Sequence, residues 1–171
     1  AHWRYSQPDI VCDILEIPEN RQYDVILCTD VLEHVPDAVR ALEKLCALAK
    51  PGGWVVVIVP LLSIMHQPPY WFQPGLSPQF FMHHIGRVTG MHIESLAMVG
   101  DYSDFMKEEV TRFLELSRQN QKLPRKIFSW CFRLFTKPTV AVLFFIMTAL
   151  QPRDRLLSAS KGVVMTARKQ K

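Results

Sequence analysis

The chain has 171 residues, of which 49% are hydrophobic and 21% are charged, and its formal net charge is +4. This length is sufficient for one domain with its own hydrophobic core, and the composition excludes an intrinsically disordered protein. The small excess of basic residues is explained by a solvated basic face, with an anionic partner or a membrane surface as the alternative.

The four cysteines show no pair with the C-x-x-C spacing, so the sequence predicts neither a zinc motif nor a redox motif. Free cysteines indicate a reducing compartment. The chain opens on AHWRYSQPDIVCD, which is not a signal-peptide pattern. We therefore expect a cytoplasmic protein, with membrane association as a further option.

The first predicted elements are two short strands. Residues 8–13, PDIVCD, end in an acid, and residues 23–28, YDVILC, follow after a polar connection. The second run does not alternate between apolar and polar residues. This lack of alternation predicts that both of its faces are buried, as in a parallel sheet covered by helices.

A helix and a strong strand come next. Residues 36–50 place apolar side chains three or four positions apart, which predicts a helix with one buried stripe, and the PGG at 51–53 is expected to end it. Residues 54–60, WVVVIVP, are the strongest strand signal in the chain. A strand, a helix and a strand at this spacing predict a βαβ unit with a right-handed crossover.

The second half of the chain repeats this alternation less regularly. We expect a helix over 76–90 that begins at Ser77, a weaker strand over 91–100, a charged helical stretch over 101–126 and a last strand over 162–169.

The hydrophobic segment 127–150 has two interpretations. Arg133, Lys137 and Pro138 interrupt it, and the uninterrupted apolar run from 140 to 150 is too short to span a bilayer. Basic residues beside aromatic ones suit an interfacial membrane anchor. The alternative is a core helix or a lid over a substrate pocket.

Several motifs now occur in a fixed order. They are Asp13 after a short apolar run, Ile17-Pro18, YDVILCTDVLEHVPD at 23–37, KPGG at 50–53 and the apolar strand at 54–60. This succession resembles the second half of a class I S-adenosylmethionine-dependent methyltransferase of the type 11-like branch. The resemblance covers residues 9–100 and extends to the last strand.

The resemblance implies an α/β, Rossmann-like, mostly parallel sheet with flanking helices and an antiparallel last strand. We expect residues 1–171 to form the C-terminal portion of a single methyltransferase-like domain. Residues 101–150 would be a helical, partly hydrophobic insertion before the last strand. The glycine-rich turn of the family's first motif is missing, because no G-x-G occurs in the chain. We therefore expect a truncated form that lacks the first strand or strands and is weak or inactive alone, with a true loss of cofactor binding as the alternative.

The resemblance also implies that S-adenosylmethionine is the cofactor and lies across the carboxyl ends of the parallel strands. Asp13 would accept a hydrogen bond from the adenine amino group, and Ile14 would cover the ring. The floor under the adenosyl and methionine parts would be formed by Cys28, Thr29 and Asp30.

Each of these assignments has a structural alternative. Asp13 can cap the following turn, and Thr29 and Asp30 can be polar residues at a helix start. The resemblance places His34 near the mouth of the cofactor site, whereas the alternative is a surface salt link between Glu33 and His34.

The loop after the apolar strand is the expected acceptor side. His66 could deprotonate an acceptor hydroxyl or amine, or it could be a loop histidine bonded to backbone. Tyr70 and Trp71 suggest an aromatic-lined acceptor pocket, although they could equally be core. Phe72 and Gln73 stand where relatives often have an acid and an arginine. No cluster of metal ligands is visible, and no metal is expected.

The function that these observations favour is methyl transfer to a small or lipid-like acceptor, by in-line displacement that depends mainly on proximity. One alternative is a non-catalytic methyltransferase-like binding protein. Another is a peripheral membrane module that uses 127–150. Half of a dinucleotide-binding oxidoreductase is disfavoured because G-x-G-x-x-G is missing, and nucleic-acid binding is not expected. Acceptor identity and oligomeric state stay open.

Overall fold

The structure is a computed structural model that describes residues 8–100, 102–116 and 161–171, together with single positions and short pieces between 138 and 149. In chain order, its elements are η1 (Ile14–Glu16), β1 (Tyr23–Thr29), η2 (Leu32–His34), α1 (Ala38–Leu48), β2 (Ala49–Pro60), α2 (Pro78–Ile85), β3 (Met91–Val99), α3 (Tyr102–Leu116) and β4 (Gly162–Lys169). Elements η1 and η2 are single turns of 3-10 helix.

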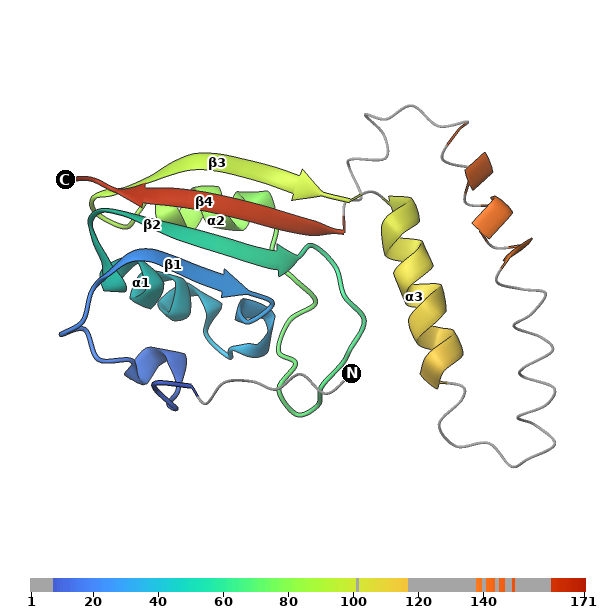
Figure 1. Cartoon of the computed structure of the whole chain (residues 1–171), viewed down its shortest axis with the longest axis horizontal. Helices are drawn as coiled ribbons and strands as arrows, with labels where there is room; N and C mark the ends of the chain where they lie inside the picture. The colour runs from blue at the N-terminus through green and yellow to red at the C-terminus, as the bar shows by residue number, and fades with distance from the viewer. Residues whose placement is uncertain are drawn as a thin grey trace.

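The described strands form one sheet in the order β1-β2-β4-β3 (Figure 1). Strands β1 and β2 pair in parallel, with Cys28 opposite Val57. Strand β4 is antiparallel to both β2 and β3, so β1, β2 and β3 all point the same way. The predicted α/β architecture, a mostly parallel sheet with an antiparallel last strand, is confirmed.

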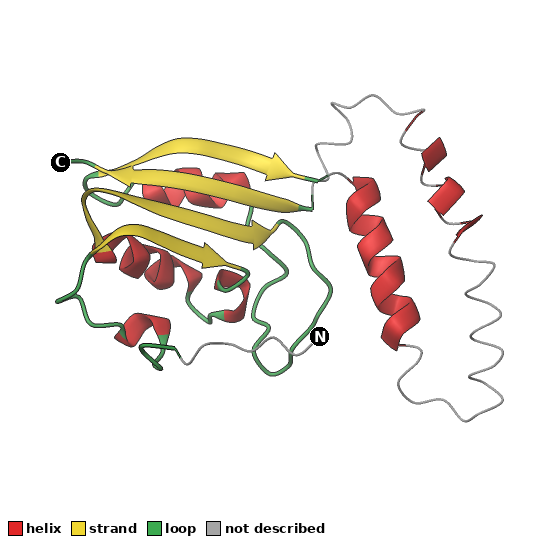
Figure 2. Cartoon of the chain, in the orientation of Figure 1, coloured by secondary structure: helices red, strands yellow, loops and turns green. Residues whose placement is uncertain are grey.

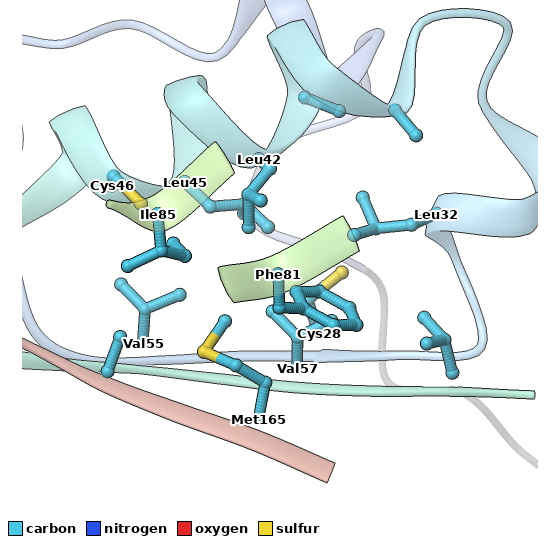
Figure 3. Close-up of a cluster of buried hydrophobic side chains, with 14 of the residues drawn as sticks. Cys28, Leu32, Leu42, Leu45, Cys46, Val55, Val57, Phe81, Ile85 and Met165 are labelled. Atoms are coloured by element: carbon cyan, nitrogen blue, oxygen red, sulfur yellow. The ribbon is translucent and has the colours of Figure 1, made fainter. Parts of the chain in front are cut away.

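Helices α1 and α2 cover the same face of this sheet (Figure 2). Side chains of β2 alternate, so Val55 and Val57 are fully buried under the helices. Figure 3 shows Leu42 of α1 and Phe81 of α2 above these valines, with Met165 of β4 beside them. This cluster is the hydrophobic core, and it holds the carboxyl ends of β1 and β2 in a defined position.

The prediction that both faces of the 23–28 strand are buried is wrong. Val25 is 60% exposed and Leu27 is 66% exposed, whereas Cys28 on the other face is buried. In the described part of the chain, β1 is an edge strand, and the helices cover only the face on which Cys28 lies. An unbroken apolar run was therefore not sufficient evidence for two covered faces.

The predicted strand at 8–13 is also not formed. These residues are irregular and exposed, and Asp13 instead caps η1. A strand needs a neighbouring strand to pair its backbone groups. In the described sheet β1 pairs only with β2, and residues 8–13 do not pair with the other edge of β1.

The helix predicted over 36–50 is α1, which begins after Asp37, whose carboxylate accepts the N–H of Arg40 at 3.0 Å. The PGG motif belongs to β2 rather than to a helix stop. A Cβ on Gly53 would lie 2.9–3.1 Å from backbone oxygens of Tyr23, Asp24 and Lys50, so a larger residue would push β1 and β2 apart.

Helix α2 begins at the predicted position, since Ser77 caps it and Pro78 lies in its first turn, but it ends at Ile85 rather than near residue 90. Strands β3 and β4 occupy the predicted stretches. Most of segment 127–150 lies outside the described residues. Within the described part, no helix has both the length and the apolar character needed to cross a bilayer.

Candidate functional site

The candidate site lies at the carboxyl ends of β1 and β2, the edge where open α/β sheets bind ligands. Strand β1 ends at Thr29, and Asp30 then turns the chain with a positive φ of 51°. The N–H of Asp30 donates to the carbonyl of Ile58 at 2.9 Å, which ties this turn to β2. The turn leads directly into η2, which directs Leu32 and Glu33 into the protein.

A cavity of about 360 Å³ opens at this edge, and we call it the polar cavity because charged side chains reach it between apolar residues such as Ile58 and Phe105. Asp30, Glu33 and His66 line it from the sheet side. Helix α3 stands beside this end of the sheet (Figure 1) and contributes Glu109 and Arg112 to the lining. The cavity therefore combines acidic groups, an imidazole and a guanidinium drawn from distant parts of the sequence.

Glu33 is the most unusual residue of this cavity. It is only 1% exposed, and its Oε2 atom has no hydrogen-bond partner within the described part of the chain. Burial raises the pKa of its carboxyl group above the ordinary value, partly opposed by a backbone hydrogen bond and by His34. Its carbonyl accepts the N–H of Phe72 at 3.1 Å, which holds the loop after β2 against η2.

Two imidazole rings lie against this carboxylate. The rings of His34 and His66 meet edge-on with centroids 4.8 Å apart. Nδ1 of His34 lies 2.6 Å from the carbonyl oxygen of Tyr70, and Nδ1 of His66 lies 3.0 Å from that of Ile64. A carbonyl only accepts, so each Nδ1 is the protonated nitrogen of its ring and each Nε2 has its own bonding capacity left.

A second, apolar cavity of about 380 Å³ lies along β1. Cys12, Ile14, Cys28 and Val31 are among its lining residues. The stretch around Asp13 and the tip of β1 therefore border one space. Asp13 itself is exposed, and its Oδ1 accepts the N–H of Leu15 at 2.8 Å, so it caps η1, which is the structural alternative for this residue.

Three of the six predicted cofactor residues line a cavity, whereas Asp13, Thr29 and His34 line neither of the two. Ile14 and Cys28 line the apolar cavity, and Asp30 lines the polar one, whereas Thr29 is exposed between them. Burial, together with nearby acidic groups, raises the pKa of the Cys28 thiol to about 11, so this group stays neutral at physiological pH.

The predicted acceptor residues differ from one another in their surroundings. His66 lines the polar cavity. The side chain of Tyr70 is exposed, and its contact with His34 is made by its backbone carbonyl. Trp71 is half-buried, and its indole N–H donates to Ser63 Oγ at 3.4 Å.

Sequence reasoning missed two features of this site. Glu33 is buried rather than exposed in a surface salt link, and its apolar neighbours Leu32 and Val35 were the signal for an inward turn. Glu109 of α3 reaches the same cavity, with Oε2 buried and without a partner in the described residues. No local pattern places Glu109 beside Glu33, because they are far apart in the chain.

Comparison with known proteins gives these cavities a context. Residues 2–98 match a family model described as a methyltransferase domain. Ubiquinone biosynthesis O-methyltransferase of Nitrosospira multiformis is 46% identical over 95 residues, which is 56% of this chain and 34% of that protein. The enzyme of the same name from Bordetella pertussis is 59% identical over 34 residues, 20% of this chain and 14% of its own length. The chain therefore aligns with at most about a third of these relatives.

Solved structures agree on the fold. A SAM-dependent methyltransferase from Archaeoglobus fulgidus matches with a TM-score of 0.54 and 13% identity, over 94% of this chain and 66% of that one. The [4+2]-cyclase SpnF matches with a TM-score of 0.51 and 16% identity, over 93% and 55%. These structural matches establish the Rossmann-like fold. At such low sequence identity they do not establish the reaction, since one of the matched proteins is named as a cyclase.

Proposed function

Because the chain belongs to the methyltransferase-domain family, as the resemblance predicted, we propose that it contributes to S-adenosylmethionine-dependent methyl transfer to a small or lipid-like acceptor. The observation that supports this proposal most directly is a pair of cavities, one at the carboxyl ends of β1 and β2 and one along β1 that reaches the β1 tip at Cys28 and Val31. The cavity along β1 is lined almost entirely by apolar residues and suits an adenosyl group, and the other has charged side chains among its lining residues and suits an acceptor with a polar group. The turn at residues 28–31 separates them.

On the cofactor side, Ile14 and Cys28 would give apolar cover to adenine. The exposed carboxylate of Asp13 would accept a hydrogen bond from the adenine amino group through the oxygen that does not cap η1. Thr29 and Asp30 would face the ribose and methionine parts. These described residues fit one side of the cofactor. The chain has no G-x-G turn for the other side, so binding by this chain alone is expected to be weak.

On the acceptor side, His66 is the proposed general base. Its Nδ1–H is held by the carbonyl of Ile64, which leaves Nε2 to take a proton from an acceptor hydroxyl in the polar cavity. The cofactor supplies an electrophilic methyl group. The chain's own contribution is alignment. Trp71 donates to Ser63, which lines the cavity, and His34 holds the 64–73 loop through the Tyr70 carbonyl.

The names of the relatives suggest the class of acceptor. The matched proteins are named as O-methyltransferases of ubiquinone biosynthesis, so a hydroxyl group on a lipophilic ring is the first acceptor to examine. The polar cavity is compatible with one hydroxyl group approaching His66, and the exposed Tyr70 and half-buried Trp71 could contact a flat ring.

The cofactor proposal is tested by titrating S-adenosylhomocysteine into isotope-labelled protein and following backbone resonances by NMR. We expect weak binding, with shifts concentrated at residues 12–15 and 27–34. Asp13→Asn should weaken binding further, whereas Glu19→Gln, an exposed acid paired with Lys44, should not. Shifts confined to other surfaces would overturn the assignment, and micromolar affinity would overturn the expectation of a half-site.

A further inference from the structure

The geometry points to a binding site for a first-row divalent cation of the zinc class, formed by Glu33, His34 and His66. One ligand atom from each of these residues lies within 4.8 Å of the other two. The three residues come from η2 and from the loop after β2, so the cluster exists only in the folded chain. The sequence alone had indicated no such cluster.

The hydrogen bonds of the two histidines support this assignment. Each ring donates its Nδ1–H to a backbone carbonyl, His34 to Tyr70 and His66 to Ile64. Metal-binding histidines typically make this contact, because it fixes the tautomer and orients the other nitrogen as a ligand. Nε2 of His34 lies 3.9 Å from Oε1 of Glu33, too far for a hydrogen bond.

The buried carboxylate is an independent observation. The side chain of Glu33 is 2% exposed, and Oε2 has no donor within the described residues. A buried carboxylate without a donor is costly, so it is normally paired or bound to a metal ion. Protonation of His34 would supply a charge at Oε1 and still leave Oε2 without a partner. A cation between the carboxylate and the two Nε2 atoms would satisfy all three groups.

The ligand types select the metal class. Two imidazole nitrogens and one carboxylate suit Zn²⁺ and similar transition metals, whereas Mg²⁺ prefers an all-oxygen site. Zinc bonds of about 2.0–2.2 Å place neighbouring ligand atoms about 3.3 Å apart, so binding would draw the three side chains inward by about 1 Å. The cavity leaves a fourth position open for water or for an acceptor oxygen. With Nε2 of His66 serving as a ligand, the metal ion and not His66 would activate the acceptor hydroxyl in the metal-bound protein.

The experiment uses the full chain with Cys12→Ser and Cys131→Ser, so that neither the exposed thiol of Cys12 nor Cys131, which lies outside the described residues, competes for metal. After treatment with a chelator, Zn²⁺, Co²⁺ and Mg²⁺ are titrated separately against a chromophoric chelator. We expect one equivalent of Zn²⁺ or Co²⁺ and at least about a tenfold loss of affinity in Glu33→Gln, His34→Gln and His66→Gln. The matched control is His83→Gln on α2, which should bind as the parent does.

A second readout does not depend on how well the variants fold. In the parent protein, Zn²⁺ should shift the imidazole nitrogen resonances of His34 and His66 and leave those of His83 and His92 in place. The proposal is overturned if the metal binds less than one equivalent, if the three variants bind normally, if other histidines shift instead, or if Mg²⁺ binds as tightly as Zn²⁺. Binding of S-adenosylhomocysteine, measured separately, reports on the proposed function and not on this site.

Discussion

At the scale of single residues, the side chain of Glu33 is the most deeply buried acidic group in the described part of the chain. Glu33 is buried, its pKa is raised by burial, and Oε2 has no donor in the described residues. A carboxyl group whose pKa is higher in the folded than in the unfolded state binds protons more readily when folded. Its contribution to stability therefore becomes less favourable as the pH rises from the unfolded pKa through the folded pKa.

Replacing Glu33 by glutamine should accordingly stabilise the metal-free protein at neutral pH, by about 1 kcal/mol in the free energy of unfolding, because an unpaired buried charge is removed. The gain should shrink as the pH is lowered and the wild-type carboxyl becomes neutral. Urea unfolding at several pH values measures both effects. Glu94→Gln, on an exposed side chain of β3, is the control and should show no comparable gain. Destabilisation at neutral pH in Glu33→Gln would contradict this account.

The cysteines give a second test at the same scale. Burial raises the pKa of Cys28 to about 11 and that of Cys46 to about 12, whereas Cys12 is exposed. In a Cys131→Ser background at pH 8, iodoacetamide should modify Cys12 first and should reach Cys28 and Cys46 only when the protein is unfolded in urea. Mass spectrometry of peptides resolves the three sites. Rapid labelling of Cys28 in the folded protein would show that the β1 tip is open to solvent.

At the scale of elements, one face of the sheet is packed and the other is not. Helix α1 buries Leu42 completely against the sheet, while Leu27 on β1 is 66% exposed on the opposite face. Within the described residues, only one face of the apolar strand β1 is therefore buried. The same local pattern accommodates both situations, because burial depends on what lies above the strand.

This contrast predicts different costs for the same substitution. Leu42→Ala should lower the free energy of unfolding by about 3 kcal/mol, since it removes buried methyl groups and leaves a cavity. Leu27→Ala should cost less than about 1 kcal/mol. Chemical denaturation of the two variants gives the comparison directly. Equal large losses would mean that another part of the protein or a partner covers the exposed face of β1 in solution.

At the scale of the whole molecule, the site is assembled from segments that are distant in sequence. The β1 tip and η2 bring Asp30, Glu33 and His34, the loop after β2 brings His66, and α3 adds Glu109. The parallel pairing of β1 and β2 explains this convergence, because both strands end at the same edge of the sheet.

Local sequence signals were enough to predict the existence and order of most elements. The apolar run of β2, the helical spacing of α1, the Ser77-Pro78 start of α2 and the last strand β4 were each predictable, since these signals depend on residues within one or two turns. The ordered motifs around residues 13–60 also indicated the family, which the family match confirms.

Other features arise only when the chain folds. Folding left the outer face of β1 exposed, gave residues 8–13 no strand to pair with, and placed Glu33 inside the protein beside His34 and His66. The physical reason is the same in each case. Burial, pairing and the approach of side chains depend on neighbours brought by chain folding, and periodicity along a segment does not encode those neighbours.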